Sequence, residues 1–118
     1  MDEQTIVSAV GKLTSTLGTM ALVSTHPDDP LALPEPPGAD AIAVYEGHIN
    51  VLKAQVEPSY HNLLSMSLRD YRGGYPDRAG AYLIEFLEKF SQEPSYSQTF
   101  SAESQRKMNF CLADLREL

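Results

Sequence analysis

Apolar residues recur every three or four positions along most of this chain, and strand-like alternation never persists. The clearest stripe occupies one face of a predicted helix and consists of Ala79, Tyr82, Leu83, Phe86, Leu87 and Phe90. Similar stripes run through residues 6–20, 42–56, 60–71 and 108–118. The chain is therefore predicted to be all-α, a bundle of four to five amphipathic helices around one core.

The length of the chain fits a single domain, residues 1–118, and leaves no room for two. Accessible-surface scaling predicts that about two-thirds of the surface of a chain of this length is buried on folding. Hydrophobic residues make up 42% and charged residues 21%, which is ordinary for a globular domain. A core can therefore form without the help of metals or disulfides.

Prolines interrupt the helical pattern in two places. Residues 25–38 contain five of the eight prolines, so this segment is predicted to run extended after the first helix, as an ordered strap or a mobile loop. Pro58 breaks or kinks the helical pattern, so residues 40–72 are predicted to form either two helices or one kinked helix. Residues 92–101 are predicted to be a loop, and Ser101 is predicted to cap the last helix.

Negative charge is concentrated in the N-terminal half. The formal net charge is −7; residues 1–57 hold eight acids against two bases, a net of −6, whereas residues 58–118 hold eight acids and seven bases. An acidic chain without a basic stripe is a poor ligand for nucleic acid and for anionic membranes, so neither is expected as a partner. A basic protein partner would be steered toward the N-terminal half. The alternative is that the charge only keeps the protein in solution.

Cysteine usage and hydropathy both favour the cytoplasm. Cys111 is the single cysteine, so no internal disulfide can form. The N-terminus opens with acidic residues where a secretory signal would be basic. No run of the sequence approaches the roughly 18 apolar residues of a membrane span.

No set of residues has the pattern of a catalytic or metal site, and no cofactor is expected. His26, His48 and His61 lack the spacing of known zinc or di-iron motifs. No G-x-S-x-G motif is present, and Cys111 lies on the apolar stripe of the last helix, where a buried and unreactive thiol is predicted. The protein is therefore predicted not to be an enzyme. The alternative is an enzyme or small-molecule sensor with His48 or His61 beside an apolar cavity.

The stretch RDYRGGYPDRAG, residues 69–80, is rich in glycine and arginine but matches neither the dinucleotide fingerprint nor the Walker A loop. Its glycines fit the end of one helix and its proline fits the start of the next, so a connection between two helices is predicted. Tyr71 and Tyr75 beside Arg72 and Arg78 have the composition of a protein-binding hot spot. The alternative is that Tyr71 completes a core stripe and Tyr75 packs on the turn.

These features together favour a small acidic protein without catalytic activity that binds a protein partner. Within this class a bacterial toxin-neutralising (immunity) protein is preferred, because its acidic surface would block a basic toxin domain. The alternatives are a secretion chaperone or adaptor, and a mobile-element inhibitor whose acidic surface mimics nucleic acid. The residues predicted to bind the partner are Asp28, Asp29, Glu35, Asp40, Glu46, Glu57, Tyr71, Arg72, Tyr75 and Arg78.

The sequence is compatible with either a monomer or a homodimer. An amphipathic bundle of this length can be stable by itself. Four apolar positions are surplus to the predicted stripes and would suit a dimer face: Val7, Leu22, Val23 and Phe110.

Overall fold

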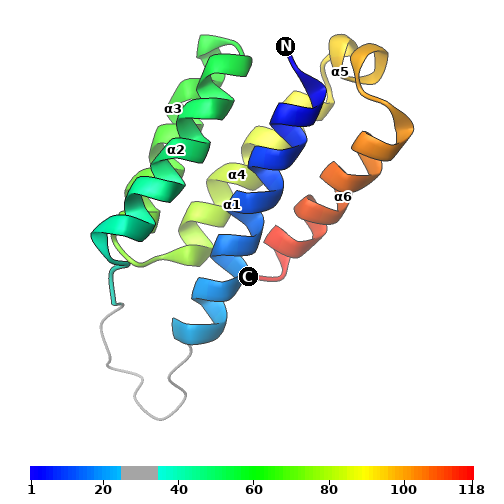
Figure 1. The fold of residues 1–118 in the computed structure, drawn as a ribbon. Coiled ribbons are helices and arrows are strands. Elements are labelled where there is room, and N and C mark those ends of the chain that lie inside the picture. Colours follow the sequence, from blue (N-terminus) through cyan, green and yellow to red (C-terminus); the bar gives the residue numbers. More distant parts are fainter. Residues whose placement is uncertain (25–34) are drawn as a thin grey trace.

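The computed structural model describes residues 1–24 and 35–118, and these residues form helices without any strand (Figure 1). In chain order the helices are α1 (Glu3–Ser24), α2 (Ala39–Gln55), α3 (His61–Arg72), α4 (Pro76–Ser91), α5 (Pro94–Thr99) and α6 (Ala102–Arg116). A 3-10 turn, Pro58–Tyr60, precedes α3. The all-α prediction is confirmed. Most of the proline-rich segment 25–38 lies outside the described residues, so its predicted conformation stays a prediction.

The described residues contain six α-helices, more than the four to five expected. The helical pattern is broken at Pro58, so residues 40–72 form two helices rather than one kinked helix. The loop predicted for residues 92–101 is wrong, because this stretch contains the short helix α5. Pro94 at the first position of α5 has the φ that a helix requires, and buried Tyr96 and Phe100 anchor the segment.

The helices are arranged in two layers (Figure 1). In one layer α1 lies in the centre and packs against α2 on one side and α6 on the other. The second layer consists of α3 and α4, which pack on each other and on the first layer. The chain enters α1 and α6 at the same end of the molecule, so these two helices run parallel.

The core lies between the two layers and contains side chains from every helix. Its fully buried members include Ile6, Leu13 and Leu17 of α1, Ile49 and Leu52 of α2, and Leu83 and Phe86 of α4. The apolar stripes predicted from the sequence therefore face inward. The last residue, Leu118, is partly buried and packs against this core.

The connection between α3 and α4 has the conformation predicted for residues 69–80. Gly74 adopts a φ of +85°, the left-handed region that glycine enters without strain. The amide of Tyr75 donates to the carbonyl of Asp70 at 3.0 Å and satisfies a free acceptor at the end of α3. Pro76 occupies the first turn of α4. A side chain at position 74 would lie only 2.8 Å from the carbonyl oxygen of Glu35, so glycine also allows the chain before α2 to approach.

The N-termini of α1 and α6 are joined through one carboxylate. Ser101 caps α6 as predicted, because its hydroxyl accepts the amide of Ser104 at 3.2 Å. The Ser101 hydroxyl donates to Glu3 Oε1 at 2.8 Å, and the Ser101 amide donates to the same oxygen at 3.1 Å. The Ser104 hydroxyl also donates to it. Hydrogen bonds from Ser104 and then Ser101 lower the pKa of Glu3.

This link predicts a loss of stability in acid. A carboxylate with a lowered pKa in the folded state stabilises the fold fully above its unfolded pKa, near 4.5, and loses that effect as the pH falls through the folded pKa. Glu3→Gln is expected to lower the melting temperature at pH 7 and to match the wild type in strong acid. The control is Glu103→Gln, which removes a more exposed carboxylate from the same region. Melting temperatures measured across the pH range for both variants and the wild type test this prediction. Equal effects of the two variants at pH 7 would contradict this role of Glu3.

Candidate protein-binding surface

Helix α2 has apolar residues on both of its faces. Tyr45, Ile49 and Leu52 face the core and are buried. The opposite side is exposed and also apolar, with Val44 58% and Val51 39% exposed. We call this side the outer face of α2; it consists of Ala43, Val44, Gly47, Val51 and Ala54, together with Asp40 and Asn50. A contiguous exposed apolar patch, unlike a single exposed apolar residue, marks a candidate site for binding another molecule.

The surface of this stripe is flat in its middle. A Cβ built on Gly47 would meet no atom within 4 Å, so the helix backbone is open to the outside at this point. Val44 and Val51 lie one turn on either side of Gly47. A partner can therefore approach the backbone of α2 closely between the two valines.

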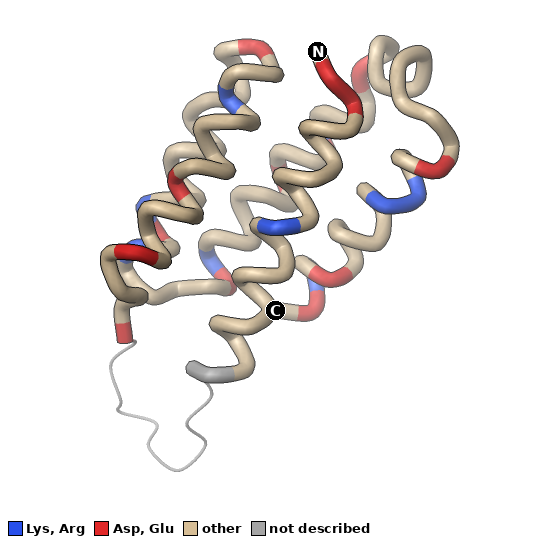
Figure 2. Tube along the Cα trace, viewed as in Figure 1, with Lys and Arg blue, Asp and Glu red and all other residues tan. Residues whose placement is uncertain are grey.

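Acidic residues lie around the outer face of α2, mainly toward the start of the helix. Glu35 and Asp40 are exposed there, and Figure 2 shows acidic residues at this end of α2 and just before it. Glu46 lies at one edge and forms an ion pair with Arg72 of α3. Glu57 follows the other end of the helix, about 25 Å away for a helix of 17 residues, so the structure does not group it with Glu35.

The α3–α4 connection lies beside the same end of α2, because the backbone of Glu35 is packed on Gly74. Tyr75 is partly exposed here, and the Arg78 guanidinium carbon lies 4.2 Å from the centre of its ring. The structure thus brings together Glu35, Glu46, Arg72, Tyr75 and Arg78 of the predicted binding residues. Asp28 and Asp29 lie outside the described residues.

Tyr71 does not belong to this surface. Its side chain is only 3% exposed and stacks on Tyr45, with ring centres 4.0 Å apart and planes 7° apart. The prediction that Tyr71 binds a partner is wrong, and the alternative prediction, that it completes a core stripe, is confirmed. The reason is that α2 crosses over α3 at this point and covers the ring.

Buried hydrogen bonds hold the inner side of α2 in place. The hydroxyl of Tyr45 lies 2.7 Å from Ser67 Oγ, and the Ser67 hydroxyl donates to the carbonyl of Ala79 in α4 at 2.9 Å. Since the Ser67 proton is used for Ala79, Tyr45 is the donor to Ser67. Burial raises the pKa of Tyr45, so the phenol stays protonated. The outer face of α2 is therefore presented on a fixed helix.

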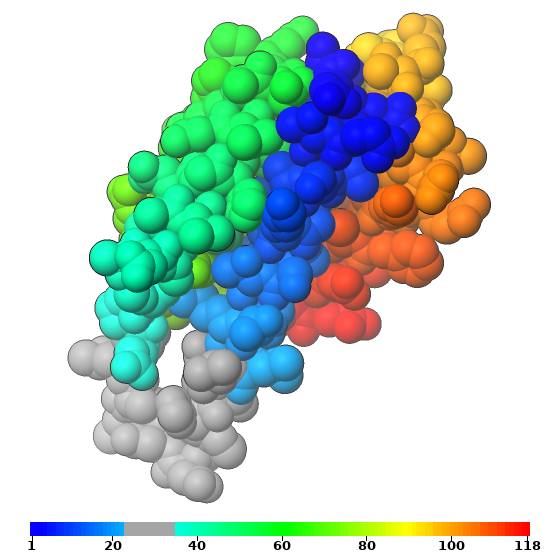
Figure 3. All heavy atoms as spheres, in the orientation of Figure 1, coloured from blue at the N-terminus to red at the C-terminus, as the bar shows by residue number. Residues whose placement is uncertain are grey.

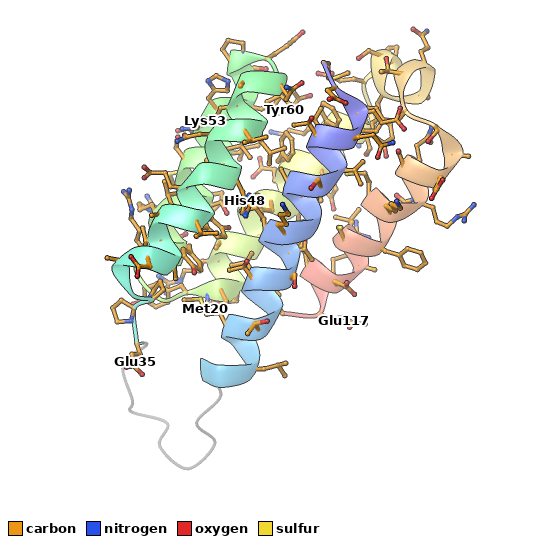
Figure 4. All side chains as sticks on the ribbon, in the orientation of Figure 1. Met20, Glu35, His48, Lys53, Tyr60 and Glu117 are labelled. Carbon is orange, nitrogen blue, oxygen red and sulfur yellow. The ribbon has the colours of Figure 1, made fainter. Side chains whose placement is uncertain are left out.

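The two described histidines do not converge on a common site. His48 lies between α2 and α1 (Figure 4), where burial and then the charge of Lys12 lower its pKa. His61 Nε2 lies 2.8 Å from the carbonyl oxygen of Lys53 and is occupied by this hydrogen bond. Within residues 1–24 and 35–118, no group of three His, Cys, Asp or Glu side chains is placed to hold a metal ion.

Cys111 is less buried than predicted. Its thiol is half-buried on α6, and desolvation raises its pKa, which disfavours the reactive thiolate. In the described part of the chain, every helix is too short or too polar to reach across a lipid bilayer.

Comparison with known proteins adds no relative. No family model matches the chain, and no curated protein or solved structure is significantly similar to it. The surface described above is therefore the basis for a function.

Proposed function

We propose that this protein is a cytoplasmic, non-catalytic binding protein that covers a basic surface of a protein partner, in the way a toxin-neutralising (immunity) protein covers its toxin. The observation that carries the proposal is the outer face of α2: an exposed apolar stripe with acidic groups at its edge and end. Protein interfaces commonly have this anatomy, with an apolar centre and a polar rim.

The two parts of the surface have different roles in binding. The valines and the backbone at Gly47 supply apolar area that a partner can remove from water. Glu35 and Asp40 attract a partner of opposite charge and increase the rate of encounter. Tyr75 and Arg78 extend the surface at the N-terminal end of α2. Tyrosine and arginine are among the residue types that contribute most to the binding energy of protein interfaces.

The apolar stripe favours a protein partner over a role as a mimic of nucleic acid. A mimic requires a dense array of negative charge, whereas Asp40 is the only charged residue on the outer face of α2. The fixed inner side of α2 also supports binding, because a preformed helix loses little entropy on association.

Gly47→Lys separates binding from folding. No atom lies within 4 Å of a new Cβ, and replacing a helical glycine stabilises a helix by up to about 1 kcal/mol. A lysine at the centre of the surface would be repelled by a basic partner and would block the close approach, so affinity is expected to fall about 100-fold. Gly11→Lys on α1 is the matched control, because a new Cβ there would also meet no atom within 4 Å.

The measurement is site-specific photo-cross-linking in the native host. A photoreactive residue replaces Val51, and in a parallel strain it replaces exposed Leu22 of α1. The proposal expects one protein adduct at position 51, in which the cross-linked peptide comes from a basic surface of the partner. Gly47→Lys should abolish this adduct, and Gly11→Lys should leave it unchanged. If position 51 yields no adduct beyond those at position 22, or if Gly47→Lys leaves it unchanged, the proposal is wrong.

A further inference from the structure

A shallow apolar groove runs between α1 and α6 on the side of the molecule where the two helices meet. Its volume is about 450 Å³, and it is lined by Val7, Ser8, Gly11, Lys12 and Ser15 of α1 and by Lys107, Phe110 and Cys111 of α6. Phe110 is 65% exposed beside the groove, the most exposed aromatic ring among the large apolar side chains of the described residues. Neither described histidine lines it.

The charges around this groove are balanced, unlike those of the chain as a whole. The charged residues counted here are Lys12 of α1 and those on the side of α6 that carries Phe110. All six are exposed: the bases are Lys12, Arg106 and Lys107, and the acids are Glu103, Asp114 and Glu117. The whole chain has 9 bases and 16 acids, so the remainder has 6 bases and 13 acids, a net charge of −7. Two copies of this protein, each with a net charge of −7, therefore repel each other less through this neutral face than their net charge would imply.

The charges on α6 nearest to Phe110 are also self-complementary. Arg106 and Lys107 lie one turn before Phe110, and Asp114 lies one turn after it. If a second copy packs its α6 antiparallel, with a two-fold axis near Phe110, Arg106 of each copy lies opposite Asp114 of the other. The like-charged Glu103 and Glu117 then meet only at the ends of the contact, about 10 Å from the axis. Such a contact forms twice by symmetry, as in the isologous interfaces of homodimers.

We propose that the α1–α6 groove is the interface of a homodimer in which the two α6 helices pack antiparallel and the Phe110 side chains fill the grooves beside Gly11. A second copy fits better than an acidic peptide or an anionic amphiphile, because a second copy brings a basic residue, Arg106, opposite Asp114, whereas either of those would bring negative charge to it. The groove is separate from the outer face of α2, since α1 lies between α2 and α6 (Figure 3). The dimer interface is therefore independent of the proposed partner site.

Two variants test whether the groove is the interface. Wild-type protein is expected to show a reversible monomer–dimer equilibrium in sedimentation equilibrium over a concentration series. Gly11→Lys, which places a side chain in the groove, and Phe110→Asp, which removes the ring, are each expected to weaken dimerisation by about 100-fold. Gly47→Lys, on the other side of α1, is the control and leaves the dimer intact.

A charge swap tests the identity of the occupant. Arg106→Glu and Asp114→Lys each place like charges opposite each other twice, and each is expected to weaken the dimer about tenfold. The double variant Arg106→Glu with Asp114→Lys restores opposite signs and with them the dimer, which no other occupant would bring about. Circular dichroism checks that each variant is folded. A wild type that stays monomeric, or a double variant no stronger than the singles, would overturn the proposal.

Discussion

Replacing Tyr45 with alanine is expected to lower the free energy of unfolding by about 3–5 kcal/mol, the usual cost of deleting a buried aromatic ring. The ring is 1% exposed and stacks on Tyr71 with centres 4.0 Å apart. Alanine would leave a cavity between α2 and α3 and would leave Ser67 without the hydrogen bond from the phenol. Chemical denaturation followed by circular dichroism measures the loss.

Tyr45→Phe is the matched control for this prediction. It keeps the ring and removes only the hydroxyl, so the expected cost is about 0.5–1.5 kcal/mol. Ser67 can still donate to the carbonyl of Ala79. If phenylalanine costs as much as alanine, then the hydrogen bond and not the packing of the ring stabilises α2.

Replacing Phe90 with alanine is expected to have an effect of similar size, about 3–5 kcal/mol, at the other end of the core. Its ring is the centre of an aromatic cluster, with ring-centre distances of 5.9 Å to Tyr60, 5.5 Å to Phe86, 5.6 Å to Tyr96 and 5.7 Å to Phe100. Tyr96 is the buried residue of α5, and Phe100 follows its last turn. Losing the ring should therefore free α5 as well as destabilise the whole fold.

Two measurements distinguish these consequences. Denaturation gives the global loss, and limited digestion with chymotrypsin, which cleaves after exposed aromatic residues, reports on the release of Tyr96 and Phe100. The control is Phe110→Ala, which deletes the same ring from an exposed position and should change the stability of the monomer by no more than about 0.5 kcal/mol. If the Phe90 variant shows no faster cleavage in α5, then α5 is held by contacts other than this cluster.

The proposed binding surface was predictable only in part. The acidic residues near the start of α2 stand out as charges in a sequence. Val44, Gly47, Val51 and Ala54 repeat at spacings of three and four, which is a signal that a sequence contains, but Tyr45, Ile49 and Leu52 repeat in the same way. A period of 3.6 residues identifies stripes on a helix without showing which stripe its neighbours will cover.

Short segments without their own periodicity were harder to predict. Helix α5 has six residues, too few for an apolar stripe, and it depends on rings of α4 that are near only in the folded chain. Tyr71 raised the same difficulty, since its tyrosine and arginine neighbours have the composition of an exposed hot spot. Its burial follows from the position of α2 above α3.

The amino-acid sequence by itself determined the helices with strong stripes, the break at Pro58, the cap at Ser101 and the turn at Gly74, because local backbone and hydrogen-bond preferences decide these features. The tertiary structure decided which apolar stripes became core and which remained exposed on α2 and in the α1–α6 groove. That choice depends on contacts between segments far apart in the chain. Such contacts form only when the two layers close on each other.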